Sequence, residues 1–112
     1  MGVNKNPEKT IFLAVHGNIQ GVGYRVFVYE IAKKYNINGM VRNVSDGSVE
    51  ILAIGNEKDL KQFIKNINIS TNNMSVFNIE KFSNKNKIKH FFQSEAQNND
   101  FIIEKTKILE NN

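Results

Sequence analysis

The segment Gly17–Gly23 carries three glycines and separates an apolar run from an amphipathic one, and this junction constrains the fold most strongly. The run before it, residues 10–16, is short and rich in β-forming residues, so it predicts a buried strand that ends at Gly17. After the junction, apolar residues recur every four positions from Phe27, which predicts a helix over about 24–35. The N-terminal part of the chain therefore has the order strand, glycine loop, helix.

Two further strands are predicted over residues 39–43 and 48–54, because both segments are rich in apolar and β-branched residues. The connection between them contains Asp46-Gly47, a pair that favours a tight turn. This position between two strands already explains both residues, so we assign Asp46 to the hairpin and give it no catalytic role. The two strands are expected to pair antiparallel.

Asn56 is a candidate N-cap for a second helix, in which apolar residues recur at helical spacing from Leu60. A fourth strand is predicted over 75–82, and residues 101–103 are expected to add pairing at a sheet edge. Between them, the segment 83–100 has little periodicity and many Asn and Lys residues, so it is interpreted as a long loop or irregular segment.

The order strand, helix, strand, strand, helix, strand predicts an α+β fold, the ferredoxin-like split β-α-β sandwich. We expect a four- to five-stranded antiparallel sheet with two helices on one face. A chain of 112 residues has the usual size of one domain. The expected organisation is an N-terminal extension over 1–9, a domain over 10–105 and a C-terminal tail over 106–112.

Composition limits the class of protein. The chain has no cysteine, which excludes a disulfide framework, a thiolate zinc site and a cysteine nucleophile. No apolar run approaches the roughly 20 residues that span a bilayer, and the N-terminus lacks a signal-peptide pattern. We therefore expect a cytoplasmic monomer with no membrane partner. The net charge of +4 would attract a small anion as readily as RNA.

The glycine loop is a candidate anion site. Glycines allow successive backbone N–H groups to converge, and the helix that follows adds its positive N-terminal end. Arg25 lies at the start of that helix, where its planar guanidinium can reach two phosphate oxygens. A glycine-rich turn can also be merely structural. This loop has neither the Gly-Lys-Ser/Thr ending of a P-loop nor the Gly-x-Gly-x-x-Gly spacing of a dinucleotide-binding fold.

Three motifs together are more specific than the loop alone. The sequences GNIQGVGYR at 17–25, GMVRN at 39–43 and SDGSVE at 45–50 resemble the acylphosphatase family. The resemblance extends from about Thr10 to Ile67. It implies hydrolysis of a small acyl phosphate to a carboxylate and inorganic phosphate, with no cofactor and no metal. In the closing strand of the family a basic residue is usual where Glu104 stands here.

The resemblance also assigns site residues. It implies that Arg25 binds the phosphate together with loop amides, for which we take the backbone of Gln20, Gly21, Val22 and Gly23. The resemblance further implies that Asn43, which closes the second motif, orients the attacking water. Because an amide is not a strong base, the substrate's own phosphate is the expected acceptor of the water's proton.

Several side chains have simpler interpretations. His16 is expected on the opposite sheet face from Leu13 and Val15, and His90 is taken as an ordinary surface histidine. Lysines and phenylalanines near the C-terminal half form a possible RNA-binding patch, for which solvated lysines are the alternative; they are Lys81, Phe82, Lys85, Lys87, Lys89, Phe91 and Phe92. The predicted central strand 48–54 has no aromatic residue on which a base would stack, so no nucleic-acid partner is expected.

A second alternative is a non-catalytic acylphosphatase-like module that serves a larger assembly. The presence of both Arg25 and Asn43 favours the enzyme over this module. The motifs recognise the phosphate and not the acyl group, so they do not identify the physiological substrate.

Overall fold

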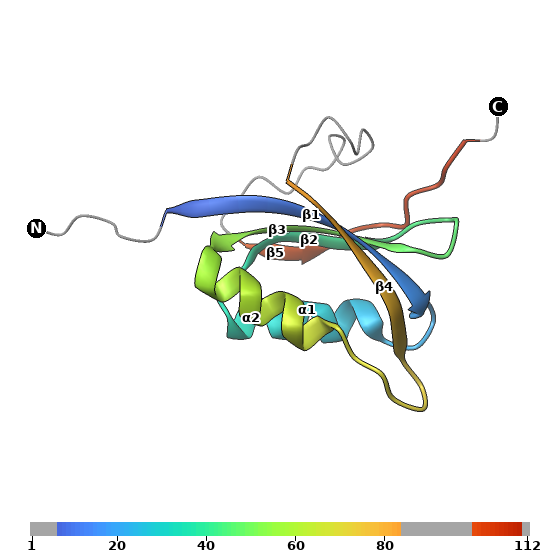
Figure 1. Ribbon diagram of the computed structural model, residues 1–112. Coiled ribbons are helices and arrows are strands. Elements are labelled where there is room, and N and C mark those ends of the chain that lie inside the picture. Colours follow the sequence, from blue (N-terminus) through green and yellow to red (C-terminus); the bar gives the residue numbers. More distant parts are fainter. Residues whose placement is uncertain (1–6, 84–99, 111–112) are drawn as a thin grey trace, which may run out of the picture.

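The computed structural model describes residues 7–83 and 100–110. Two helices cover one face of a five-stranded sheet (Figure 1). The elements in chain order are β1 (Glu8–Asn18), α1 (Tyr24–Lys34), β2 (Asn38–Asn43), β3 (Val49–Asn56), α2 (Glu57–Ile67), β4 (Ser75–Phe82) and β5 (Phe101–Ile103). The predicted ferredoxin-like α+β fold is confirmed, and each predicted element lies within a few residues of its expected bounds.

The sheet has the strand order β4-β1-β3-β2-β5. The first three pairings are antiparallel, but β5 pairs with β2 in parallel, with Met40 opposite Ile102. The sheet is therefore mixed and not wholly antiparallel as expected. The reason is topological: β5 runs opposite to β4, which occupies the other edge, and that direction makes it parallel to its neighbour β2.

The main core lies between the sheet and the helices. Alternate residues of the strands point into it, among them the fully buried Leu13 and Val15 of β1. Val28 of α1 and Phe63 of α2 meet them from the helical layer. Phe101 of β5 packs edge-on against Phe63, with ring centroids 6.2 Å apart. Burial of these side chains is the main source of stability, because apolar area contributes roughly 25 cal/mol per Å².

The other face of the sheet carries a second apolar cluster around Met40, which is fully buried. Its members are Phe12 and Met40 with Leu52, Phe82 and Ile102. Phe82, one aromatic residue of the possible RNA-binding patch, thus packs against its own sheet. Apart from the exposed Lys81, the rest of that patch, His90 and almost all of the predicted 83–100 loop lie outside the described residues.

A buried ion pair lies on the same outer face. The Nε of Arg42 is 2.9 Å from Oε1 of Glu50, and both side chains are at most 5% exposed. Glu104, just after β5, brings a second carboxylate to 3.8 Å from Nη1 of Arg42. The acidic residue at this position, where the family usually has a basic one, is therefore compatible with the final strand pairing because the adjacent strand supplies an arginine.

The second helix begins as the sequence predicts. Oδ1 of Asn56 accepts a hydrogen bond from the N–H of Asp59 at 2.8 Å, which makes Asn56 the N-cap of α2. Acidic residues in the first turn, Glu57 and Asp59, complement the positive end of the helix. None of the helices in the described part of the chain is long and apolar enough to cross a membrane.

Candidate phosphate-binding site

The glycine loop runs directly from the end of β1 into α1. Gly21 and Gly23 adopt left-handed backbone conformations, with φ of 76° and 88°. Only glycine adopts such angles at little cost, and a Cβ at either position would meet no other atom within 4 Å. The glycines are therefore required by the turn of the backbone and leave open space beside the loop.

Within residues 7–83 and 100–110, no side chain caps the start of α1. Gly23 is the N-cap residue and provides no side-chain hydrogen bond, and the first turn contains no acidic residue. The first bond of the helix runs from the N–H of Phe27 to the carbonyl of Gly23 at 3.0 Å. The N–H groups of the three preceding helical residues thus have no partner within the helix. With the helix dipole they give this end a positive potential.

Arg25 adds a full positive charge at the same end of the helix. Its side chain is half-buried, and no hydrogen bond or ion pair engages its guanidinium within the described residues. Arg42, the other arginine of the chain, is by contrast buried against Glu50. Arg25 is therefore available to an anionic ligand, whereas Arg42 forms an ion pair with Glu50 on the outer face of the sheet.

Asn43 is the last residue of β2. It lies two residues after Val41 and therefore on the same, helix-facing side of the sheet. The residue is 9% exposed, and within the described part of the chain its buried Oδ1 has no hydrogen-bond partner. A desolvated acceptor of this kind costs about 1–3 kcal/mol. Such groups call for an explanation, and catalysis is one. Oδ1 of Asn43 is thus a buried hydrogen-bond acceptor that a small polar molecule could use.

Gln20 connects the glycine loop to the strand that carries Asn43. Its side-chain Nε2 donates to the carbonyl of Val44 at 2.7 Å and to that of Ser48 at 2.8 Å. Sequence reasoning assigned only the backbone of Gln20 to the site and missed this side-chain role. The two acceptors are backbone groups of a hairpin that is distant in sequence, so no local pattern identifies them.

The hairpin itself is built as predicted. Oδ1 of Asp46 accepts from the N–H of Ser48 at 2.9 Å and from its Oγ at 2.6 Å. The side-chain hydrogen bond from Ser48 is the main cause that lowers the pKa of Asp46 below its ordinary value. Gly47 follows with a φ of 99°. Asp46 is thus occupied in shaping the turn after Asn43.

Tyr24 anchors the start of α1. Its side chain is buried, and its hydroxyl donates to the carbonyl of Ile67 at the end of α2, 2.9 Å away. Burial raises the pKa of the Tyr24 phenol above its ordinary value. The hydroxyl therefore satisfies one of the terminal carbonyls of α2.

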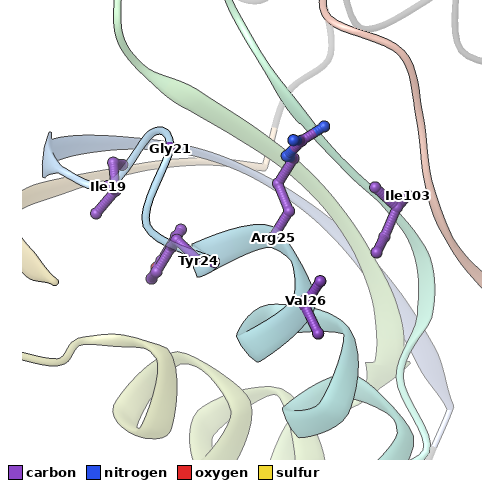
Figure 2. Close-up of a pocket in the computed structure, with 7 residues that line it drawn as sticks. Ile19, Gly21, Tyr24, Arg25, Val26 and Ile103 are labelled. Atoms are coloured by element: carbon purple, nitrogen blue, oxygen red, sulfur yellow. The ribbon is translucent and has the colours of Figure 1, made fainter. Parts of the chain in front are cut away.

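A cavity of about 310 Å³ opens beside the loop. Gly21, Gly23 and Arg25 line one side of it, so the structure brings these three predicted site residues together. Apolar side chains form the remainder, namely Ile19, Tyr24, Val26 and Ile103 (Figure 2). Gln20, Val22 and Asn43 do not line this cavity; Asn43 is joined to the loop through the hydrogen bonds of Gln20 to the hairpin.

Among the described residues, Tyr24 and Arg25 are the titratable side chains that line this cavity. Nε2 of His16 lies 2.8 Å from Oε1 of Glu80, and both side chains are about half exposed, away from the buried Leu13 and Val15. This placement agrees with the structural interpretation of His16. Over residues 7–83 and 100–110, no group of three His, Asp or Glu side chains is arranged to hold a metal ion.

Fold and site together define a small α+β protein with a glycine loop suited to bind an anion at the junction of its first strand and first helix. Residues 11–102 match the family model described as Acylphosphatase. The match covers most of the chain, and the chain therefore belongs to the acylphosphatase family. Acylphosphatases are hydrolases that cleave the carboxyl–phosphate bond of acyl phosphates, and this is the activity of the family to which the chain belongs.

Individual relatives agree with this assignment. An acylphosphatase of Pseudothermotoga lettingae is 39% identical over 72 residues, which cover 64% of this chain and 81% of that protein. An acylphosphatase of Staphylococcus haemolyticus is 58% identical over 52 residues, which cover 46% of this chain and 57% of that protein. With several curated relatives, including the latter, the match thus spans less than two thirds of their length.

Solved structures share the fold. The crystal structure of acylphosphatase from Bacillus subtilis aligns with a TM-score of 0.70 and 32% identity, covering 85% of this chain and 97% of that one. Full-length HypF, crystallised in a phosphate- and nucleotide-bound form, aligns with a TM-score of 0.76 and 28% identity. That alignment covers 94% of this chain but only 13% of HypF.

Proposed function

We propose that this chain hydrolyses acyl phosphates with the glycine loop and Arg25 as the phosphate-binding group and Asn43 as the residue that orients water. The observation that supports this most strongly is the guanidinium of Arg25, which has no partner among the described residues and lies beside an uncapped helix start and the open loop at Gly21 and Gly23. The guanidinium of Arg25, the N–H groups of the helix start and the loop backbone lie together there. The first turn of α1 contains no carboxylate, so this arrangement suits a dianion.

In the proposed mechanism the backbone N–H groups of Gln20, Gly21, Val22 and Gly23 and the guanidinium of Arg25 hold the phosphoryl oxygens. These charge-assisted hydrogen bonds contribute on the order of 1.5–3 kcal/mol each. They also offset the charge that spreads over the phosphoryl group in the transition state. Binding and catalysis would therefore use the same groups.

Asn43 supplies the second part of the mechanism. Its buried Oδ1 accepts a hydrogen bond from the attacking water and so fixes the direction of a lone pair toward phosphorus. The water oxygen bonds to phosphorus, the bond from phosphorus to the carboxyl oxygen breaks, and the carboxylate leaves with the bonding electrons. A proton of the water passes to a phosphoryl oxygen, so the products are a carboxylate and protonated inorganic phosphate.

The direct test is hydrolysis of benzoyl phosphate by the purified chain, followed by the change in ultraviolet absorbance. We expect turnover that is lost in Arg25→Ala and kept in Lys58→Ala, which removes one exposed positive charge from α2. A folded protein with no turnover would contradict the proposal and support the binding module instead.

We also propose that the activity needs no metal ion and that the chain is a cytoplasmic monomer without a nucleic-acid partner. Unchanged hydrolysis after dialysis against EDTA tests the first point. Sedimentation equilibrium tests the second, with a single species of 12.8 kDa as the expected result. The assignment of 10–105 as the catalytic domain, between an N-terminal extension and a C-terminal tail, belongs to the same proposal.

A second candidate function is supported by the likeness to HypF, in which the matched region is a small part of a much larger chain. In that case the site would bind an anion for a larger assembly without rapid turnover. Inorganic phosphate binding without hydrolysis of any acyl phosphate would favour this candidate over the free enzyme.

A further inference from the structure

The cavity beside Arg25 has two chemically distinct ends. One end has the glycine loop, the uncapped helix start and the guanidinium of Arg25, beside the almost fully buried side chains of Ile19 and Tyr24 (Figure 2). At the other end stand the side chains of Val26, from the first turn of α1, and Ile103, from β5 (Figure 2). An anion-binding end next to an apolar end matches a ligand that has a phosphate at one end and an apolar group at the other.

The apolar end is unusual for its exposure. Val26 is 55% exposed and Ile103 is 41% exposed, and they are two of the four large exposed hydrophobic residues in the described part of the chain. The other two, Phe77 and Ile108, do not line this cavity. The exposure of Val26 and Ile103 is therefore concentrated at the site, where an apolar ligand group would remove both side chains from water.

The size of the cavity admits such a ligand. Its volume of about 310 Å³ lies at the low end of the range of small-molecule sites, roughly 300–1,000 Å³. A cavity of about 150 Å³ is sufficient for a benzene ring. There is consequently room for a phosphate group and for an aryl or branched aliphatic group beside it.

We infer that Val26 and Ile103 form the binding site for the acyl group of the substrate, and that the preferred substrates are acyl phosphates with an apolar acyl group. This inference rests on the proposed function, because it takes the phosphate to be held by Arg25 and the loop. The loop and Arg25 recognise only the phosphate. Val26 and Ile103 then provide the selectivity for the acyl group that the motifs lack.

Ile103 is the more informative residue of the pair. It belongs to the short edge strand β5, so its position depends on the pairing of Val41 with Ile103. Val26, by contrast, is fixed by the helix that also carries Arg25. Selectivity for the acyl group would thus depend on a residue outside the phosphate-binding loop. Ile103 can therefore be replaced without altering the phosphate contacts.

The experiment compares the binding of phenylphosphonate, methylphosphonate and inorganic phosphate to the purified chain by calorimetry. We expect phenylphosphonate to bind at least about tenfold more tightly than methylphosphonate, which is the size of discrimination that an apolar pocket achieves. In Ile103→Ala and in Val26→Thr this ratio should fall to about threefold or less, while the affinity for inorganic phosphate stays unchanged. Phe77→Ala, which removes an exposed apolar side chain elsewhere, should keep the ratio.

The kinetic counterpart is the ratio of kcat/KM for benzoyl phosphate to that for acetyl phosphate, which should fall by a similar factor in both variants. Unchanged affinity for inorganic phosphate shows that a variant is folded. If Ile103→Ala disturbs β5, Val26→Thr still tests the inference, because it keeps the shape of the side chain. Equal binding of the two phosphonates, or ratios unaffected by both variants, would overturn the inference but leave phosphate binding and hydrolysis intact. Absence of both phosphate binding and hydrolysis in the unmodified chain would overturn the proposed function and this inference with it.

Discussion

The side-chain nitrogen of Gln20 lies 2.7 Å from the carbonyl oxygen of Val44, the residue that follows Asn43. Through this bond, and a second one to the carbonyl of Ser48, the proposed phosphate-binding loop is attached to the strand end that carries the proposed water-orienting amide. The two parts of the site are thereby held at a fixed separation, as in-line attack on phosphorus requires.

Replacement of Gln20 tests this attachment. Gln20→Ala removes two hydrogen bonds, so the free energy of unfolding should fall by roughly 1–3 kcal/mol. We expect kcat for benzoyl phosphate to fall more than its KM changes, because the phosphate contacts of the loop remain. Gln20→Glu keeps the size of the side chain but has no N–H to donate, and it should behave no better than alanine. Urea unfolding and steady-state kinetics measure both effects, and wild-type kcat in either variant would refute the role of the attachment.

Replacement of Arg25 separates charge from geometry. Arg25→Ala should lower kcat/KM by about 10²-fold or more, since one charge-stabilising donor in a preorganised site is worth that much. Arg25→Lys should lose most of the activity as well, because an ammonium group is a point charge without the planar fork. The matched control is Lys58→Ala. An Arg25→Lys variant with nearly full activity would show that charge alone suffices.

Asn43→Ala should have opposite effects on activity and on stability. Hydrolysis of benzoyl phosphate should be removed, while the affinity for inorganic phosphate is spared. The protein should not be destabilised and should gain up to about 1 kcal/mol, because the substitution removes a buried acceptor that has no partner among the described residues. Thermal unfolding, phosphate titration and hydrolysis measure the three quantities. Near-normal hydrolysis would exclude the proposed role of Asn43.

Tyr24→Phe tests the contact between the helix ends. Loss of the hydrogen bond to Ile67 should cost about 1 kcal/mol of stability with little change in activity. The pKa of Tyr24 is raised in the folded protein from the ordinary value of 10.0, so the unfolded state loses its phenolic proton first as the pH rises. The contribution of Tyr24 to the free energy of unfolding is therefore fully present below about pH 10 and is lost as the pH rises above that value. Urea unfolding between pH 8 and 11 should show a shallower loss in Tyr24→Phe than in the unmodified chain.

Most of the fold was predictable because local patterns specify it. The spacing of Leu60, Phe63 and Ile67 defined α2, and the alternation of Leu13 and Val15 defined the core face of β1. The direction of β5 was not predictable in this way. It depends on which edge of the sheet the chain reaches after β4, and three residues from Phe101 to Ile103 carry no signal for that choice.

The candidate site was predictable only in part, for a related reason. Arg25, Gly21 and Gly23 lie in one continuous motif, so sequence alone places them together. The side-chain bonds of Gln20 and the hydroxyl contact of Tyr24 join residues 24 or more positions apart. The apolar wall at Ile103 likewise depends on strand pairing. Contacts of this kind follow from the tertiary fold and leave no periodic trace in the sequence.

The backbone after β5 continues along the hairpin next to the site. The N–H of Lys107 donates to the carbonyl of Asn43 at 2.8 Å, and the N–H of Ser45 donates to the carbonyl of Lys107 at 2.9 Å. β1, by contrast, begins at Glu8 opposite Asn56, at the far end of the sheet from the glycine loop (Figure 1). An affinity tag or a fused protein placed after Leu109 would therefore pull on the backbone of Asn43, whereas the same addition before Glu8 would leave the site undisturbed.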